Sequence, residues 1–285
     1  MGIKLLNLSH TYEGVSKNDL VGAVKEVNLE INETDEFVAV CGRTGSGKST
    51  LIQHMNGLLI PTSGSIDILG SVLTAKKRKN PKLKPIRKRV GFVFQFPEYQ
   101  LFEETVLKDI MFAPKNFGAT EEEAKKSALE AVKILGIDEK LLSKSPFNLS
   151  GGQMRKVAIA GILSYNPDIL ILDEPTRGLD PEGAKEIMEL FNKINKEMHK
   201  TIILISHDMN IVYQYATRIV VMSEGLKVYD GSKEELFKSD LYAKYDLDKP
   251  EVLKAIDHIN NKLDLAIDYN NYTLDDLVSA LRRLL

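Results

Sequence analysis

The sequence contains a single cysteine, no long apolar run and no excess of either charge. Cys41 is alone, so no disulfide can form within the chain, and a reducing cytoplasm is expected. Because Cys41 follows the apolar run FVAV, we expect a buried structural thiol rather than a reactive one. Lys and Arg total 38 and Asp and Glu total 40, so no overall positive field attracts nucleic acid.

A membrane-spanning segment is also missing from the pattern of the 285 residues. Such a helix needs about 18 apolar residues in succession. The run TIILI at residues 201–205 has only the length of a strand. If the protein works at a membrane, we therefore expect another subunit to form the pore.

Short apolar runs alternate with helical patterns in the main part of the chain. Residues 36–41 form a β-branched and apolar run that stops at Gly42, and residues 51–59 then place apolar side chains at helical spacing. Residues 169–172 and 201–205 suit the buried strands of a parallel sheet. This order of strands and helices predicts an α/β fold.

Helix start signals divide the rest of the chain. A crossover helix is predicted at residues 181–198, with Asp180 as its N-cap and Pro181 at its first position. Residues 92–163 are expected to form a helical insertion, in which TEEE at residues 120–123 is a capping box.

The last part of the chain has a different sequence pattern from the part before it. Two short amphipathic helices are predicted there, at residues 250–263 and 273–285. The sequence thus predicts a main domain at residues 1–245 and a helical extension at residues 246–285.

The segment GRTGSGKS at residues 42–49 fits the phosphate-loop pattern G-x-x-x-x-G-K-[ST] between a predicted strand and helix. An ordinary glycine-rich turn is the alternative, which these flanks disfavour. In the functional interpretation, backbone N–H groups and the helix N-terminus face phosphate oxygens, Lys48 reaches the β- and γ-phosphates, and Ser49 binds Mg²⁺. The nucleotide-binding residues expected here are Gly42, Thr44, Gly45, Ser46, Gly47, Lys48, Ser49 and Thr50.

Two carboxylates and a histidine follow the later strands. Asp173 and Glu174 come directly after the run ILIL, at the carboxyl end of a buried strand, where α/β sheets bind their ligands. Asp173 is expected to bind Mg²⁺, and Glu174 to polarise the attacking water. His207 ends the next strand and is expected near the γ-phosphate. The alternative for all three is a solvated or packed side chain at a strand end.

A second helix end with exposed amide groups is predicted at LSGGQ, residues 149–153. Ser150 can cap this helix, while Gly151 and Gly152 leave its N-terminus uncovered and open to a second anion. Gln153 completes the motif.

Together, GRTGSGKST, LSGGQ, ILILDEPT, the GLD at residues 178–180 and His207 resemble the ATP-binding cassette family in order and spacing. The resemblance implies a RecA-like lobe with an antiparallel β subdomain and a helical lobe. It also implies that Tyr12 stacks on adenine, that Gln95 senses Mg²⁺ and the γ-phosphate, and that Asp180 communicates across a dimer. Simple packing is the alternative for Tyr12.

The resemblance further implies a head-to-tail dimer that hydrolyses ATP. In it, the LSGGQ helix of one cassette closes over ATP held by the phosphate loop of the other. Each chain therefore supplies half of each of two sites, and Ser150, Gly151, Gly152 and Gln153 contact the nucleotide of the partner. Catalysis is expected to rest on Glu174, His207, Gln95 and Lys48.

The segment FPEYQLFEET at residues 96–105 resembles the ATPases of energy-coupling-factor (ECF) vitamin importers, in the form of the second of two paralogues. There, this segment contacts the transmembrane coupling subunit, so we expect residues 97–105, from Pro97 to Thr105, to do so here. A paralogous ATPase would complete the dimer, a separate membrane subunit would bind the substrate, and the chain would lie at the cytoplasmic face of the membrane. The extension would add a dimer contact. A generic loop is the alternative for this segment.

Other interpretations stay open. The basic residues between 76 and 89 favour a solvated loop over a contact with anionic lipid. Nucleic-acid binding is disfavoured, because no stacking aromatic residues are interleaved with these charges. A conventional ABC transporter is the nearest alternative. A soluble cassette acting on DNA or ribosomes would carry a long coiled coil or two cassettes, and the sequence has neither. A binding module without turnover would not need Glu174 and His207.

Overall fold

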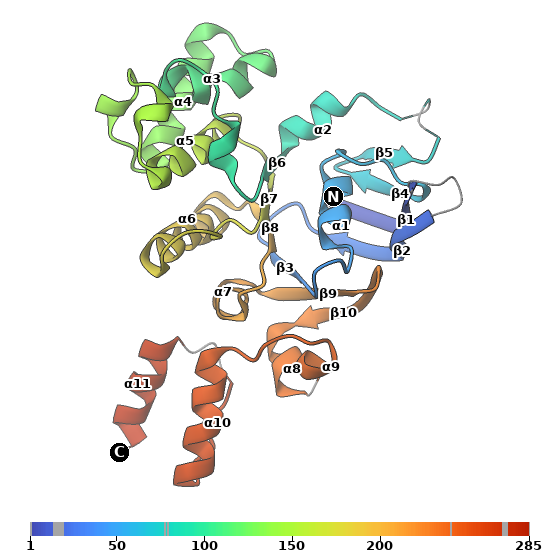
Figure 1. Ribbon diagram of the computed structural model, residues 1–285, viewed down its shortest axis with the longest axis vertical. Coiled ribbons are helices and arrows are strands. Elements are labelled where there is room, and N and C mark those ends of the chain that lie inside the picture. Colours follow the sequence, from blue (N-terminus) through green and yellow to red (C-terminus); the bar gives the residue numbers. More distant parts are fainter. Residues whose placement is uncertain are drawn as a thin grey trace.

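Two sheets and several groups of helices make up the protein in a computed structural model (Figure 1). The structure describes residues 2–13, 20–76, 78, 80–239, 241–269 and 273–284. No helix within these residues is both long and apolar enough to cross a membrane.

The central sheet has six strands among the described residues. In spatial order, they are β10 (Leu226–Ser232), β9 (Arg218–Ser223), β3 (Phe37–Cys41), β8 (Thr201–Ile205), β7 (Ile169–Asp173) and β6 (Val90–Val93). All neighbours are parallel except β10, which forms an antiparallel hairpin with β9. The predicted strands at residues 169–172 and 201–205 are confirmed, and the carboxyl ends of β3, β7 and β8 meet at one edge.

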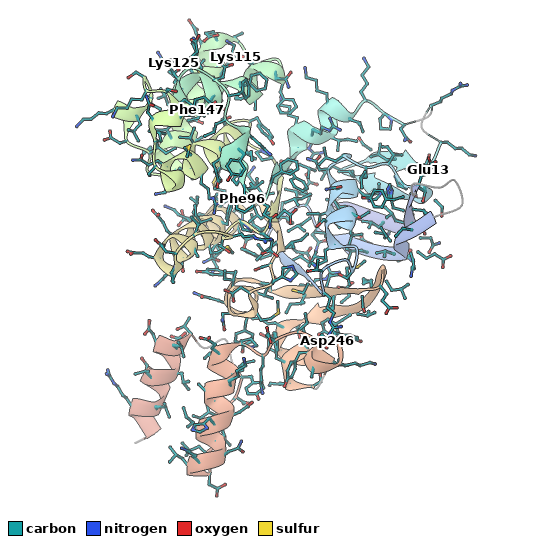
Figure 2. The ribbon with its side chains drawn as sticks, in the orientation of Figure 1. Glu13, Phe96, Lys115, Lys125, Phe147 and Asp246 are labelled. Atoms are coloured by element: carbon teal, nitrogen blue, oxygen red, sulfur yellow. The ribbon has the colours of Figure 1, made fainter. Side chains whose placement is uncertain are left out.

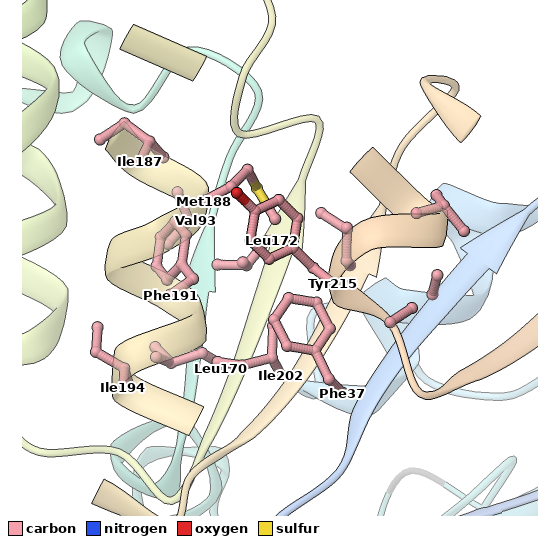
Figure 3. Close-up of a cluster of buried hydrophobic side chains, with 14 of the residues drawn as sticks. Phe37, Val93, Leu170, Leu172, Ile187, Met188, Phe191, Ile194, Ile202 and Tyr215 are labelled. Atoms are coloured by element: carbon pink, nitrogen blue, oxygen red, sulfur yellow. The ribbon is translucent and has the colours of Figure 1, made fainter. Parts of the chain in front are cut away.

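Both faces of the five parallel strands are buried, which is why these strands are apolar almost throughout, whereas edge strand β10 is only partly buried. Alternate residues face opposite cores: Leu170 and Leu172 belong to one, and Ile169 and Ile171 to the other. The first core lies under α6 (Pro181–Met198), which begins as predicted, with Asp180 Oδ1 accepting from Gly183 N–H at 2.7 Å. Figure 3 shows the α6 side chains that face the strands, Ile187, Met188, Phe191 and Ile194.

The second core lies between the central sheet and an antiparallel sheet with the order β2-β1-β4-β5. Its strands are β1 (Ile3–Glu13), β2 (Leu20–Ile31), β4 (Ser63–Ile68) and β5 (Ser71–Thr74). Helix α1 (Lys48–Met55) is buried in the same core through Leu51, Ile52 and Met55. The antiparallel β subdomain that the family resemblance implied is therefore present.

The helical lobe consists of α3 (Val106–Asn116), α4 (Glu121–Ile134) and α5 (Gly151–Leu163), which Figure 1 places together beyond the end of the sheet. The predicted capping box of α4 is present, because Thr120 and Glu123 each accept from the other's backbone N–H. Short 3-10 turns connect the lobe: η2 (Pro97–Gln100), η3 (Glu139–Leu141) and η4 (Pro146–Asn148).

The sequence analysis predicted a solvated loop for the basic segment between residues 76 and 89, and this prediction is wrong for the second half of the segment. Its second half is helix α2 (Leu83–Arg89), which buries Ile86 in the second core. Arg89 pairs with Asp168 at 2.6 Å, so part of its charge is used within the protein. Residues 77 and 79 lie outside the described residues.

After β10 the chain continues as α8 (Lys233–Lys238), α9 (Leu241–Lys244), α10 (Glu251–Leu263) and α11 (Leu274–Leu284). The last two match the predicted amphipathic helices, except that residue 285 lies outside the described residues. Buried Leu253 and Ile256 pack α10 onto the first core, and Tyr213 Oη donates to the Tyr269 carbonyl at 3.1 Å. The extension is thus attached to the α/β domain through α7 (Met209–Tyr215).

Candidate nucleotide-binding and catalytic site

The phosphate loop joins β3 to α1 and needs its glycines for steric reasons. Gly42 and Gly47 have φ angles of 134° and 100°, in the region that side chains disfavour. A Cβ at Gly42 would lie 2.1 Å from the Met222 carbonyl oxygen, and one at Gly47 would lie 2.2 Å from the Ala23 carbonyl oxygen. The loop therefore packs directly against the backbone of β9 and β2, which fixes its shape before any ligand binds.

Lys48 lies at the base of the loop and is only 5% exposed. Its ammonium donates to the carbonyl oxygens of Gly42 and Arg43, both at 2.7 Å. An ammonium has three N–H donors, so one remains to face an anion. Burial lowers the pKa of Lys48, and the negative charge of Glu174 and Asp173 opposes this shift. The lysine is thus fixed at the base of the loop, as its predicted role requires.

A cavity of about 420 Å³ opens above the loop. Its lining brings together most of the predicted residues of the phosphate loop with the strand-end groups. They are Thr44, Gly45, Gly47, Lys48, Ser49, Thr50, Gln95, Asp173, Glu174 and His207, joined by Ala23, Arg177 and Ile205. Of the other loop residues, Ser46 is buried, and its hydroxyl oxygen has no hydrogen-bond partner among the described residues.

Glu174 follows β7 in an unusual backbone conformation. Its φ angle is 49°, which non-glycine residues rarely adopt, and its N–H donates to the Ile205 carbonyl at 3.0 Å. Burial raises the pKa of Glu174 to about 7, and the charge of neighbouring Asp173 adds to this shift. Burial likewise raises the pKa of Asp173, against the opposing charge of Lys48. A carboxylate with a pKa near neutrality can accept a proton from water during catalysis.

His207 lies beside Glu174 at the end of β8. Its Nε2 is 3.3 Å from Glu174 Oε1, although the angles do not make a hydrogen bond, and this oxygen has no hydrogen-bond partner in the described part of the chain. Burial lowers the pKa of His207, and the positive charges of Lys48 and Arg177 lower it further. The imidazole is therefore expected to be neutral at pH 7, able to donate or accept a proton at the cavity.

Oxygen donors suited to Mg²⁺ lie on the same lining. The Ser49 hydroxyl, the Asp173 carboxylate and the Gln95 amide come from α1, β7 and the segment after β6. Mg²⁺ binds through a few protein oxygens together with phosphate oxygens and water. These residue types fit a magnesium ion carried by a nucleotide.

Tyr12 lies near the end of β1, next to α1 and outside the cavity lining. Its hydroxyl is 3.2 Å from Thr50 Oγ1, and its ring meets His10 edge-on at 4.6 Å. His10 in turn contacts His54 of α1 at 3.1 Å. Tyr12 itself is 40% exposed and lies beside the start of α1, so stacking of its ring on adenine stays a prediction that this placement allows.

The LSGGQ residues lie away from this cavity, at the start of α5. Ser150 and Gln153 cap each other, so the N-terminus is less bare than the sequence suggested. A Cβ at Gly151 or Gly152 would meet no atom within 4 Å, so both glycines face open space. The Asp180 carboxylate likewise caps α6, where it accepts from the Gly183 N–H. The structure does not bring residues 150–153 or Asp180 to the chain's own phosphate loop.

Sequence reasoning missed two arginines at this site. Arg177 lines the cavity, although it lies in the same DEPTRGLD stretch that was interpreted only through its carboxylates. Arg155 is 3% exposed and pairs with Glu98 of η2 at 2.8 Å. The signal for Arg155 was weak, because a charged residue in a helix is usually solvated and its partner is distant in the sequence.

A phosphate loop, two strand-end carboxylates, a strand-end histidine and a separate LSGGQ helix define an ATP-binding cassette. The family model described as ABC transporter matches residues 24–177, and the chain belongs to this family of ATP hydrolases. Energy-coupling factor transporter ATP-binding protein EcfA2 of Geobacillus kaustophilus is 49% identical over 92% of this chain and 90% of the relative. EcfA2 of Bacillus subtilis is 48% identical over 92% and 95%.

Solved structures agree with this assignment. The cbiO1 protein of Clostridium perfringens, part of the ABC transporter complex cbiONQ, has a TM-score of 0.73 at 36% identity, over 92% of this chain and 95% of that one. A dimeric ATP-binding cassette in a post-hydrolysis state with ADP and phosphate has a TM-score of 0.69 at 34% identity, over 81% and 98%.

The raised pKa of Glu174 predicts a pH-dependent change in stability. The folded state keeps the proton up to about pH 7, whereas the unfolded carboxyl loses it near 4.5, so ionisation destabilises the fold as the pH rises between these values. Glu174→Gln removes this cost. Without nucleotide, we expect the variant to be more stable than the wild type at pH 8, by on the order of 1–2 kcal/mol after allowing for partial exposure.

Chemical unfolding at pH 8 and at pH 4.5 measures this difference, which should shrink at the lower pH. Glu224→Gln is the matched control, because Glu224 also has a left-handed backbone, with φ 50°, and is exposed. An equal response of the two variants at pH 8 would refute the assigned burial cost.

Proposed function

We propose that this chain is the MgATP-hydrolysing subunit of an ECF-type importer for vitamins or other micronutrients. The observation that carries the proposal is the similarity to EcfA2 proteins across about nine-tenths of both chains. The fold and the phosphate-loop cavity supply the motor part of this function. A conventional ABC transporter ATPase is the alternative, supported by the match to the general family model.

In this proposal the chain's own groups divide the chemistry of hydrolysis. Lys48 and the loop N–H groups neutralise the phosphates, while Ser49, Asp173 and Gln95 would hold a magnesium ion, which would supply further positive charge to the nucleotide. Glu174 orients the attacking water and accepts its proton, and His207 lies within contact of Glu174. These groups surround one cavity, so the water and the phosphate can be held in line.

The LSGGQ helix is proposed to act on the nucleotide of a partner. Its glycines face open space, and the Ser150 hydroxyl caps the Gln153 N–H rather than the N–H groups of Gly151 and Gly152. A helix N-terminus attracts phosphate. Because this end lies outside the chain's own cavity, two cassettes arranged head to tail are needed to complete each site. By analogy with ECF systems, the partner is a paralogous ATPase.

An exposed aromatic surface is proposed to bind the transmembrane coupling subunit. It consists of Tyr99 and Phe102 of the predicted segment together with Phe112 of α3, which are 83%, 56% and 46% exposed. Phe102 and Phe112 meet edge-on at 4.8 Å and border a groove of about 430 Å³. Exposed aromatic groups beside a groove are typical of protein interfaces.

The same segment is tied to the catalytic loop by Arg155. Its guanidinium binds Glu98 through two nitrogens, at 2.8 and 3.1 Å, and donates through a third to the carbonyls of Pro175 and Arg177, at 3.3 and 3.0 Å. Phe96 lies at the same junction between the lobe and the sheet (Figure 2), with a ring carbon 3.6 Å from the Cβ position of Gly178. Movement of the docking segment is therefore proposed to reach the loop that follows Glu174.

In the cell, the chain would lie against the cytoplasmic face of the membrane as a peripheral subunit. A separate substrate-binding membrane subunit would contact it only through the coupling subunit. The transported compound is then chosen by that other subunit, and the present chain serves as its motor.

Docking through the aromatic surface is tested by changing Tyr99 and Phe102 to serine together. We expect the variant to lose co-purification with the polytopic membrane subunit expressed from the neighbouring genes, because the loss removes apolar contact area at the proposed interface. Val72→Ser on β5, 47% exposed, is the control and should be retained in the complex. Unchanged co-purification of the double variant would contradict this docking surface.

The assigned role of Glu174 is tested by Glu174→Gln in the assembled ATPase pair. We expect the variant to bind MgATP, to lose phosphate release by about 100-fold or more because the proton acceptor is gone, and to trap the closed dimer. Steady-state phosphate assays and size-exclusion chromatography measure both effects. A hydrolysis rate close to that of the wild type would remove Glu174 from its role.

The Arg155 link is tested by Glu98→Gln. The substitution leaves a buried guanidinium without its counter-charge, and breaking such a pair costs about 3–5 kcal/mol of stability. We also expect the membrane subunits to stimulate ATP hydrolysis less, measured as the ratio of rates with and without them. Glu186→Gln is the control, since Glu186 pairs with the adjacent Lys156 at 2.7 Å but is 60% exposed. Equal stimulation in both variants would show that the link carries no coupling.

A further inference from the structure

Arg177 is held at the cavity by its backbone while its side chain stays exposed. Its N–H donates to the Glu174 carbonyl at 3.1 Å, and its own carbonyl accepts from buried Arg155 at 3.0 Å. The side chain then joins Lys48 and Ser49 in lining the cavity. A cation on a fixed backbone therefore faces the space assigned to the phosphates.

The partner of this guanidinium is a neutral amide. With its amide oxygen turned toward Arg177, Gln95 accepts from Nε and Nη1 of the guanidinium. The ion pairs found among the described residues include none with Arg177. A hydrogen bond to a neutral oxygen is weaker than one to an ionised group, so a phosphate can displace Gln95.

The charges around the cavity favour such an exchange. Lys48 already uses two donors on loop carbonyls, and the carboxylates of Asp173 and Glu174 repel further negative charge. The terminal phosphate of ATP adds negative charge beside them. Arg177 supplies the planar fork of donors that matches two phosphate oxygens, which an ammonium does not.

We propose that Arg177 is a second phosphate-binding cation of this ATPase, which leaves Gln95 and pairs with the terminal phosphate of ATP. Gln95 is held away from the nucleotide until this exchange and is then free to reach the magnesium ion. ADP lacks the phosphate that drives the exchange, so Arg177 distinguishes ATP from ADP. The inference concerns the nucleotide site alone and holds whichever membrane partners the ATPase serves.

Binding of MgATP and of MgADP, measured by calorimetry in a non-hydrolysing Glu174→Gln background, tests the proposal. Arg177→Ala is expected to weaken MgATP binding by about 10-fold or more, as for loss of a charge-assisted pair, and MgADP binding by less than about 3-fold. Arg177→Lys keeps the positive charge, and its affinity for MgATP should lie between those of the Glu174→Gln parent and of Arg177→Ala. Arg78→Ala removes an exposed arginine outside the cavity lining and should change neither affinity.

The same measurements in a Gln95→Ala background separate direct contact from an effect through Gln95. A direct contact predicts that Arg177→Ala still weakens MgATP selectively when Gln95 is absent. Loss of the effect in that background, or equal weakening of MgATP and MgADP in either background, overturns the proposal. Retained MgADP binding shows in every case that the variant is folded and that the nucleotide site itself is intact.

Discussion

The burial of the Glu174 carboxylate beside Lys48 is the constraint on which the rest of the site depends. Burial makes a negative charge at this position costly and raises the pKa of Glu174 to about 7. The backbone at Glu174 is also held in a left-handed conformation. The rest of the fold offsets the cost of the buried charge and of the left-handed backbone. Strands β7 and β8 are buried on both faces, and the phosphate loop packs against the backbone of β9 and β2. A carboxylate whose pKa is close to neutrality is thus placed within electrostatic reach of Lys48, as the proposed role of proton acceptor requires.

The parts of the fold that local pattern controls were predictable. Apolar runs with polar boundaries gave β3, β7 and β8, and capping residues gave the starts of α4 and α6. Strand β9 was not predicted, although its buried run IVVM resembles the runs of β3, β7 and β8. Strand β10 and helix α8 were not predicted either, because β10 has the mixed sequence LKVYDGS and α8 has only six residues. The antiparallel sheet came only from the family resemblance. Its pairing depends on contacts between distant segments.

At the site, too, the residues that follow a local sequence pattern could be predicted, and those whose roles depend on distant partners could not. The phosphate loop, Asp173, Glu174 and His207 could be located because each follows a strand at one edge of the sheet. Arg155 and Arg177 could not, because their roles arise from partners elsewhere in the chain, Glu98 and Gln95. A buried arginine is stable only when hydrogen-bonding partners surround it, and a single sequence does not show which distant residues become those partners. The segment around Glu98 and the loop after Glu174 are therefore connected by an arginine that the motifs do not mark.

Glutamate carboxyl groups labelled with ¹³C and followed by NMR against pH test the central claim directly. The account predicts one glutamate resonance of the nucleotide-free ATPase that titrates near 7 and is missing from Glu174→Gln. If every glutamate of the wild type instead titrates below about 5, close to the ordinary value for exposed carboxyls, Glu174 is not held in the environment described and its role as proton acceptor loses its physical basis.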